Sequence, residues 1–381
     1  MVFLHYLHLN SGVARIFFTV TNDLTYDQRM QRICGSLAEA GHKVTLVGRK
    51  LPTSLPLHYQ PFTQKRLNCY FQKGKLFYLE FNIKLFIYLF FKRMDAVCAI
   101  DLDTILPCLW VSQWKGIPRI YDAHELFCEM KEVSSRRGIY RVWKSIEKYA
   151  VPKFNYGYTV NHAIAHAFES MYQKKYEVIR SLPTPKKPGG KKRENSILYQ
   201  GAVNEGRCFE SLIPAMLHID AELIICGDGN YMEKARKLVA DLGLQEKIIF
   251  KGLVPPAELH GYTSVAMIGI TLFESDSQSN YLSLANRFFD YIQAGTPQIC
   301  VNYPLYREIQ EQSPIGLMID KPDVKSIHAA IQLLLNDTEL WNRLHVNCVE
   351  MAATLNWEVE KKKLLEFYNG IFEKASSYHH S

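Results

Sequence analysis

The sequence has no closely spaced pair of cysteines. Its nine cysteines are scattered along 381 residues, and no two of them form a CxxC motif. This spacing argues against a zinc ribbon and a disulfide framework, and it predicts a reducing compartment. Charge of one sign is also scarce, because 45 lysines and arginines accompany 38 aspartates and glutamates, for a net charge of +7. Without a dense basic run, we expect no nucleic-acid partner.

The sequence also lacks an apolar run suited to a transmembrane helix. The longest candidate, residues 76–93, is near the short limit for a span and contains Glu80 and Lys84. The order and spacing of these two residues favour an ion pair on a helix. Such a helix could belong in a core or on a membrane surface. The apolar segment 1–20 has no basic start and no clear cleavage site, so we interpret it as an extension followed by a strand.

What is present is a repeated alternation of short apolar runs with amphipathic helices. Hydrophobic residues make up 48% of the chain, which is typical of a globular protein. The alternation predicts βαβ units, and hence an α/β fold of two Rossmann-like, doubly wound domains. The predicted strands are residues 14–20, 43–47, 96–100, 119–121, 197–200, 222–226, 247–251, 267–272 and 298–301.

The alternation is interrupted once. Residues 181–196 contain three prolines and two glycines, a composition that does not suit a buried element. We therefore predict a first domain over residues 1–182, a linker over 183–196, a second domain over 197–356 and a last helix over 357–375. The linker lysines and Arg193 are interpreted as a solvated tether.

Polar loops follow the predicted strands. Because parallel sheets bind ligands beyond the carboxyl ends of their strands, we expect the functional residues there. In the first domain these loops are residues 21–26, 101–103 and 122–125, and in the second they are 201–207, 227–230 and 273–280. A cleft between the two domains is the expected place for a large substrate.

Three of these loops allow two interpretations each. Gly227 and Gly229 could begin a dinucleotide fingerprint or form a tight turn, and Met232, in place of a third glycine, argues against an NAD-dependent oxidoreductase. The DLD sequence at residues 101–103 could hold a metal, but we prefer a helix N-cap with an acidic first turn. His124 could be a general acid–base or a hydrogen-bonded loop residue, and its place after a strand favours function.

The strongest constellation is SLANRFFDYIQAGTP, residues 283–297. Ser283 is a suitable N-cap, and Gly295 with Pro297 would end the helix. Free backbone N–H groups in the first turn would form an anion site.

Two further residues would complete a nucleotide site around this helix. Asp290 could accept hydrogen bonds from two ribose hydroxyls. Arg207, in the first loop of the second domain, could neutralise a diphosphate. The alternative interpretation is an ordinary capped helix and a surface arginine.

At these residues the chain resembles a known family. Over almost its whole length it is similar to retaining, nucleotide-sugar-dependent glycosyltransferases of the GT-B fold, close to glycosyltransferase family 4. The similar segments are TNDLTYDQRM, GHKVTLVGR, IDLDTILP, YDAHELF, YQGAVNEGR, CGDGNY, FKGLVPPAELHGYTSVAMIGI, SLANRFFDYIQAGTP and NWEVEKKKLLEFYNGI.

The resemblance implies an acceptor on the first domain, a nucleotide sugar on the second and a last helix that crosses back to the first domain. It implies transfer without a metal or a cofactor, from a donor that we expect to be linked to UDP or GDP. By position it assigns the diphosphate to Arg207, the phosphate-binding turn to Ser283 and Leu284, the ribose to Asp290 and the active-site histidine to His124. With the loop positions, the expected set is catalytic His124 and Arg207; donor-binding Gly201, Arg207, Gly227, Gly229, Ser283, Leu284, Asn286 and Asp290; and acceptor-side Asn22, Asp23, Asp103 and Glu125.

Three positions depart from the family pattern. Leu282 and Asp290 replace two motif glutamates, Ala202 stands where a second basic residue is common, and Asn22-Asp23 replaces a glycine pair. A catalytically lapsed nucleotide- or glycan-binding protein therefore remains the alternative.

The expected setting is cell-surface polysaccharide or glycan synthesis. We expect a glycan or lipid-linked glycan acceptor and a cytoplasmic protein, peripheral on the inner face of the cell membrane. The membrane contact would use the helix at residues 76–91 and the basic residues around it. These are Lys65, Arg66, Lys73, Lys75, Lys92 and Arg93.

Overall fold

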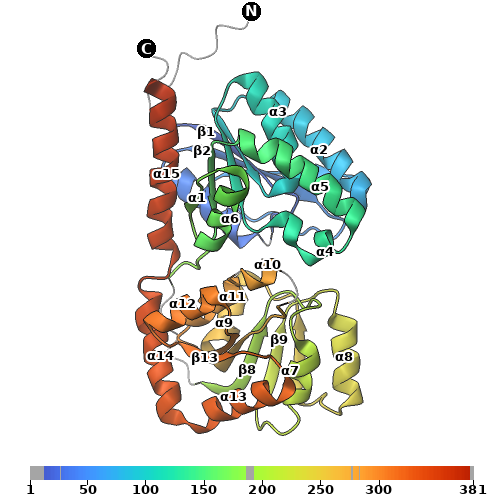
Figure 1. Cartoon of the computed structure of the whole chain (residues 1–381), viewed down its shortest axis with the longest axis vertical. Helices are drawn as coiled ribbons and strands as arrows, with labels where there is room; N and C mark the ends of the chain where they lie inside the picture. The colour runs from blue at the N-terminus through green and yellow to red at the C-terminus, as the bar shows by residue number, and fades with distance from the viewer. Residues whose placement is uncertain (1–12, 26, 186–192, 276–277, 283, 378–381) are drawn as a thin grey trace, which may run out of the picture. The chain divides into compact units, whose positions relative to one another are not determined.

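The computed structural model describes residues 13–25, 27–185, 193–275, 278–282 and 284–377 (Figure 1). The chain divides into two compact units. Unit 1 ends at Arg180 and resumes at Glu360, and unit 2 is Ser181–Val359. Each unit is a parallel sheet packed between helices, so the predicted α/β class with two Rossmann-like domains is confirmed.

The sheet of unit 1 has seven parallel strands in the order β3-β2-β1-β4-β5-β6-β7. Their bounds are β1 Arg15–Thr19, β2 Lys43–Lys50, β3 Thr63–Asn68, β4 Ala96–Ile100, β5 Arg119–Ala123, β6 Tyr156–Thr159 and β7 Glu177–Val178. The sequence predicted β1, β2, β4 and β5 from their apolar runs, and these apolar side chains are mostly buried. It missed β3, a polar strand at one edge of the sheet, and the short strands β6 and β7.

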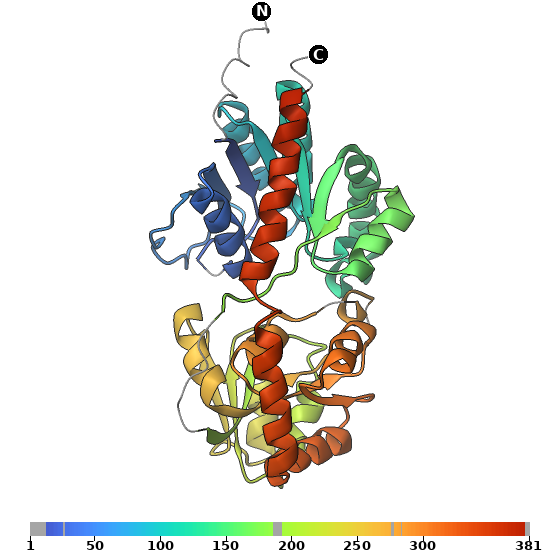
Figure 2. The ribbon, with the colours of Figure 1, turned by 90° about the vertical axis from the view of Figure 1, so that its left-hand side faces the viewer.

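Helices cover both faces of this sheet. Helices α2, α3 and α5 lie side by side on one face, and α1, α6 and the last helix, α15, lie on the other (Figures 1 and 2). Their bounds are α1 Gln28–Glu39, α2 Gly74–Phe90, α3 Ile105–Lys115, α4 Lys131–Ser134, α5 Arg137–Ala150, α6 His162–Tyr172 and α15 Trp357–Ser377. The short 3-10 turns are Leu102–Thr104, Phe127–Glu129 and Val151–Lys153.

The last helix returns to unit 1 and is held there by buried groups. Tyr368 is fully buried, with its ring centroid 6.0 Å from that of Phe18 and its hydroxyl 3.5 Å from that of Tyr158. The Glu360 carboxylate accepts a hydrogen bond of 2.8 Å from the backbone N–H of Arg180. The predicted return of this helix to the first domain is thus present in the fold.

The sheet of unit 2 has six parallel strands in the order β10-β9-β8-β11-β12-β13. The strands are β8 Glu194–Gln200, β9 Glu222–Cys226, β10 Ile248–Gly252, β11 Ala266–Thr271, β12 Gln298–Val301 and β13 Gly316–Ile319. The helices are α7 Phe209–Ala215, α8 Met232–Asp241, α9 Pro256–Val265, α10 Gln278–Tyr281, α11 Asn286–Gln293, α12 Pro304–Gln312, α13 Val324–Asn336 and α14 Thr338–Ala352. Of these strands, the sequence missed only β13.

The predicted linker is partly wrong. Residues 194–196 belong to strand β8, and residues 186–192 lie outside the described part of the chain. Arg193 is not a solvated tether residue, because its guanidinium donates four hydrogen bonds of 2.7–3.0 Å. The acceptors are Ala266 O, Thr296 Oγ1, Ala294 O and Gly295 O. Arg193 therefore ties the start of β8 to the end of α11.

Helix α2 has one buried and one exposed apolar face. Phe77, Phe81, Leu85 and Leu89 recur every four residues and are buried. The predicted Glu80–Lys84 ion pair is confirmed, with 2.6 Å between Oε1 and Nζ. Within the described residues, no helix is both long and apolar enough to cross a membrane.

Candidate active site

A pocket of about 470 Å³ opens at the carboxyl ends of β1 and β4, the two central strands of unit 1. The connections from β1 and β4 lead to opposite sides of the sheet, and open α/β sheets bind ligands at such a point. The pocket is lined by polar residues and a few aromatic ones. These include Thr21, Asn22, Arg49, Lys73, Tyr78, Asp101, Asp103, His124 and Glu125.

His124 lies between two carboxylates. Its Nδ1 is 3.4 Å from Asp101 Oδ2, and its Nε2 is 3.3 Å from Asp122 Oδ2. Asp101 also accepts a hydrogen bond of 3.0 Å from the His124 backbone N–H, which fixes the loop after β5. Only 22% of the His124 side chain is exposed. The sequence placed His124 correctly at this edge, but did not predict that both ring nitrogens face carboxylates.

Asp122 is fully buried and is paired with Arg29 of helix α1. Arg29 Nη2 donates a hydrogen bond of 2.8 Å to Asp122 Oδ1, and Nη1 donates one of 3.2 Å to the carbonyl of Ile179. The Arg29 guanidinium also lies 5.8 Å from the ring centroid of Tyr158. Arg29 was not singled out in the sequence, since nothing in its helical pattern marks it as buried.

These contacts set the protonation states. Burial disfavours the charged form of His124, but the Asp101 and Asp122 carboxylates outweigh burial and raise its pKa to about 10. Burial and the Asp101 carboxylate raise the pKa of Asp103 to about 7, although a hydrogen bond from Thr21 opposes the shift. At neutral pH, His124 is therefore an imidazolium, and Asp103 is the group that can gain or lose a proton.

The preferred interpretation of residues 101–103 as a helix cap is wrong in one respect. Asp101 stands at the N-cap of the 3-10 turn Leu102–Thr104 but makes no capping hydrogen bond. Its side chain holds the His124 loop instead, and its backbone adopts φ 55°, a conformation that side chains rarely tolerate. Among the described residues, no group of three His, Cys, Asp or Glu side chains could hold a metal ion.

Of the residues that the sequence predicted on the acceptor side, some line this pocket and one does not. Asn22 and Glu125 line the pocket together with Asp103. Asp23 is not part of the lining, because its carboxylate is paired with Arg66 and accepts hydrogen bonds from Ser54 and from Thr25. The Asp23 side chain is 10% exposed, so its role in this fold is to hold the loop after β1.

In unit 2, the loops at the corresponding edge of the sheet contain closely packed glycines. A Cβ on Gly227 would lie 1.8 Å from the carbonyl oxygen of Gly201, so the loops after β8 and β9 touch through their backbones. A Cβ on Gly229 would lie 2.3 Å from Asn204 Oδ1. No larger residue fits at Gly227 or Gly229, because the loop after β8 packs directly against the backbone there.

Two arginines lie near these loops. The guanidiniums of Arg207 and Arg287 lie 4.3 and 4.6 Å from the ring centroid of Phe273. Arg207 also donates a hydrogen bond of 3.2 Å to Asn280 Oδ1. Arg287 is 7% exposed, and its Nη1 would lie 3.4 Å from a Cβ placed on Gly201.

Arg287 is a buried basic residue at this edge that the sequence analysis did not single out. It donates hydrogen bonds to the carbonyls of Ile270 and Leu272 at the end of β11, and makes no ion pair within the described residues. Arg287 lies in the first turn of helix α11, within the segment 283–297 that the sequence analysis ranked highest, and this position could have marked it as a candidate. The guanidinium brings positive charge to the loop in which Ala202 replaces a basic residue.

Asp290 lies one turn further along α11. Its Oδ2 accepts a hydrogen bond of 2.8 Å from Gln200 Nε2, at the end of β8, and Gln200 Oε1 accepts one from Thr263. The structure thus brings Asp290 to the same edge as Gly201 and Arg287.

The predicted start of this helix is wrong. Helix α11 begins at Asn286, with Ala285 at the N-cap and without a capping side chain. The hydroxyl of Tyr306 accepts a hydrogen bond of 3.1 Å from the Ala285 backbone N–H. Leu284 precedes the helix, and Ser283 lies outside the described residues.

The charge state of His124 leads to a measurable pH dependence. A pKa raised from 6.5 to about 10 stabilises the fold below pH 6.5, and this stabilisation is lost as the pH rises towards 10. We expect the ring protons of His124 to titrate near pH 10 in an NMR experiment. Asp101→Asn removes one carboxylate and should lower the midpoint. A midpoint near 6.5 in the wild-type protein would contradict the paired geometry.

Comparison with known proteins gives a family match for unit 2. A family model described as glycosyl transferases group 1 matches residues 183–350. The GDP-mannose-dependent alpha-(1-6)-phosphatidylinositol monomannoside mannosyltransferase of Mycobacterium tuberculosis is 27% identical over 152 residues, which are 39% of this chain and 40% of that protein. The chain thus matches less than half the length of this curated relative.

Solved structures resemble the chain over nearly its whole length. Sucrose-phosphate synthase from Thermosynechococcus elongatus has a TM-score of 0.76 at 18% identity, over 95% of this chain and 100% of that structure. Anabaena HepE in complex with UDP and glucose has a TM-score of 0.74 at 12% identity, over 94% and 100%. At such identities the likeness establishes the fold. The chain has the two-domain Rossmann-like fold of GT-B glycosyltransferases, and residues 183–350 match the glycosyl transferases group 1 family.

Proposed function

We propose that this chain is a glycosyltransferase that transfers a sugar from a UDP- or GDP-linked donor to a hydroxyl of a glycan or lipid-linked glycan, with retention of the anomeric configuration. One observation carries the proposal. Within the segment matched by the family model, Arg207, Arg287 and Asp290 lie around the carboxyl ends of β8 and β11. Two guanidiniums and a carboxylate provide what a nucleoside diphosphate needs: positive charge for the phosphates and an acceptor for the ribose hydroxyls.

Arg207 and Arg287 would stabilise the departing diphosphate, whose negative charge grows in the transition state. Retention would follow from attack on the face that the diphosphate leaves. The leaving phosphate oxygen would accept the proton of the acceptor hydroxyl as the new glycosidic bond forms and the old one breaks. No metal ion is required, because the arginines supply the charge.

The pocket of unit 1 would hold the acceptor. Asp103 and Glu125 can accept hydrogen bonds from sugar hydroxyls. The imidazolium of His124, whose two ring nitrogens face Asp101 and Asp122, can stabilise negative charge. With a pKa of about 10, His124 is a hydrogen-bond donor and not a general base at neutral pH.

A screen of donors tests the whole proposal. The full chain is incubated with UDP- and GDP-linked sugars and a set of glycosyl acceptors, and products are detected by mass spectrometry. We expect one donor to be used, with activity unchanged by EDTA, and an anomeric signal in the product NMR spectrum that matches the donor configuration. Nucleotide binding without transfer of any sugar would support the lapsed binding protein that Leu282 suggests. Inversion would refute retention.

Two substitutions separate binding from turnover. Asp290→Ala should weaken nucleotide affinity in calorimetry by about tenfold to a few hundredfold, since a hydrogen bond to a charged group contributes about 1.5–3 kcal/mol. Asp290→Asn should fall between, because it keeps the shape and loses the charge. His124→Ala should lower the transfer rate and leave nucleotide affinity nearly unchanged, because His124 belongs to unit 1 and the donor residues belong to unit 2.

Each variant has its own control. Loss of the Asp290 carboxylate also removes the acceptor of the Gln200 Nε2 hydrogen bond, so a thermal melt must show that Asp290→Ala is folded. Equal nucleotide affinity in the wild type and Asp290→Ala would remove the ribose assignment. Full activity in His124→Ala would show that His124 has no catalytic role and serves only in the structure of its loop.

The second part of the proposal is a membrane contact through helices α2 and α3. Exposed apolar side chains concentrate there, and we call them the α2–α3 apolar surface. They are Leu76, Leu79, Ile83, Ile87 and Phe91 at α2, with Trp110 and Trp114 on α3. The rings of Phe90 and Trp114 stack at 4.3 Å, which makes the surface continuous across the two helices.

Basic residues surround this surface. Lys73, Lys75, Lys92 and Arg93 are exposed, whereas Arg66 is paired with Asp23 and does not contribute. An exposed apolar surface with aromatic and basic residues matches an anionic lipid surface, where each basic residue contributes about 1 kcal/mol. This contact would bring the protein to a lipid-linked acceptor.

Flotation with vesicles tests the contact. We expect the protein to float with phosphatidylglycerol vesicles at low salt and less at high salt. Ile83→Glu with Ile87→Glu, both about half exposed in the wild type, should abolish flotation without unfolding the protein. Val346→Glu, on α14, is the matched control because Val346 is equally exposed. Absence of wild-type flotation, or flotation of the Ile83/Ile87 variant, would refute the contact.

A further inference from the structure

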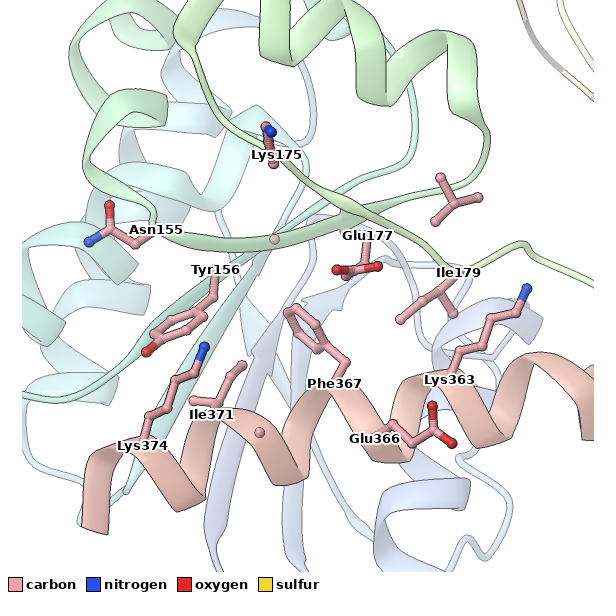
Figure 3. Close-up of a pocket in the computed structure, with 13 residues that line it drawn as sticks. Asn155, Tyr156, Lys175, Glu177, Ile179, Lys363, Glu366, Phe367, Ile371 and Lys374 are labelled. Atoms are coloured by element: carbon pink, nitrogen blue, oxygen red, sulfur yellow. The ribbon is translucent and has the colours of Figure 1, made fainter. Parts of the chain in front are cut away.

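A second cavity in unit 1 lies between the edge of the sheet and the last helix. It measures about 490 Å³ and is formed by the start of β6, by β7 and by α15, as Figure 3 shows. We call it the α15 groove. Its lining includes Asn155, Tyr156, Lys175, Glu177, Lys363, Glu366, Phe367, Gly370, Ile371 and Lys374.

The α15 groove is separate from the candidate active site. Asn155 and Tyr156 stand at the amino end of β6, whereas His124 follows the carboxyl end of the parallel neighbour β5. The two cavities share no lining residue. Whatever binds in the groove therefore does not depend on the donor or acceptor residues proposed above.

Gly370 keeps the groove open. A glycine inside a helix costs about 1 kcal/mol of stability relative to alanine. A Cβ at Gly370 would meet no atom within 4 Å, so packing within the described residues does not require a glycine there. Gly157, across the groove, differs, because its Cβ would lie 2.5 Å from the Tyr176 ring. The free space at Gly370 thus belongs to the groove and not to the core.

The lining combines apolar side chains with positively and negatively charged side chains that can form hydrogen bonds. Figure 3 shows Phe367 and Ile371 along the floor, Glu177 beside Phe367, and Lys374 and Lys363 towards opposite ends. The lining holds three lysines and two glutamates, so neither an anion nor a cation is strongly favoured.

Several of these groups have hydrogen-bonding capacity left for a ligand. Asn155 Oδ1 accepts a hydrogen bond of 2.8 Å from Lys174, which leaves its amide free to donate. The carboxylates of Glu177 and Glu366 have no hydrogen-bond partner among the described residues.

We propose that the α15 groove is a binding site for a neutral saccharide of about two rings. A pyranose ring has an apolar C–H face, which suits Phe367, and a rim of hydroxyls that donate to carboxylates and accept from ammonium and amide groups. A volume near 490 Å³ is within the usual range for small-ligand sites of about 300–1,000 Å³. In a glycosyltransferase, such a site would hold a part of the glycan remote from the reacting end.

Saturation-transfer NMR without any nucleotide tests the site, so that its outcome does not depend on transferase activity. The probes are α-1,6-mannobiose, maltose and lactose, each with the full chain. We expect transfer to the ring C–H protons of at least one disaccharide. Gly370→Phe fills the groove and should weaken that binding at least tenfold, while its melting temperature should not fall, because phenylalanine favours helix more than glycine.

Gly261→Phe is the matched control. Gly261 is an exposed glycine in helix α9, and its Cβ would also meet nothing within 4 Å. This variant should bind as the wild type does. Glu177→Ala, at an exposed position, should weaken binding several-fold through the loss of one hydrogen-bond acceptor. No transfer from the wild-type protein to any probe, or undiminished binding by Gly370→Phe, would overturn the proposal.

Discussion

The buried ion pair between Arg29 and Asp122 is the interaction on which unit 1 depends. Its side chains are 6% and 0% exposed, and loss of one partner from such a pair costs about 3–5 kcal/mol. Arg29 joins helix α1 to β5, to the chain after β7 through the Ile179 carbonyl, and to Tyr158, whose hydroxyl meets that of Tyr368 on α15. The same pair keeps Asp122 ionised, and Asp122 in turn helps keep His124 protonated. The Arg29–Asp122 ion pair therefore both holds the elements of unit 1 together and helps set the charge of His124.

Unit 2 also buries an arginine, Arg287, but holds it without a carboxylate partner among the described residues. Arg287 is held by two backbone carbonyls and by the rings of Tyr199 and Phe273, whose faces attract a cation. Contacts of this kind fix the guanidinium but do not neutralise it. A desolvated charge interacts more strongly with an anion than the same charge in water. The two units thus differ: the buried Arg29 of unit 1 is paired with a carboxylate, whereas the buried Arg287 of unit 2 makes no ion pair among the described residues.

The sequence predicted those features that depend on local pattern. Strand β4 is apolar throughout and β9 is apolar after Glu222, and the bounds predicted for both were correct. The Glu80–Lys84 pair follows from helical spacing. Features that depend on long-range contact were missed. In the sequence, Arg193 and Arg287 look like ordinary basic residues. The acceptors of Arg193 include a carbonyl about a hundred positions away, and those of Arg287 are carbonyls at the end of a neighbouring strand. The raised pKa of His124 likewise needs Asp101, which is distant in sequence.

The two faces of unit 1 explain why its helices have such different surfaces. On one face, α2 covers the sheet with the buried side chains of Phe81 and Leu85. Its opposite side exposes Leu79 and Ile83 to solvent, although packing against the sheet does not require apolar side chains there. On the other face, α15 buries Tyr368 but retains Gly370 beside an open groove. In both places the sequence departs from what stability alone would select. Natural sequences depart from local consistency mainly where function requires it. We therefore place the proposed ligand contacts at these two surfaces and at the carboxyl edges of the sheets.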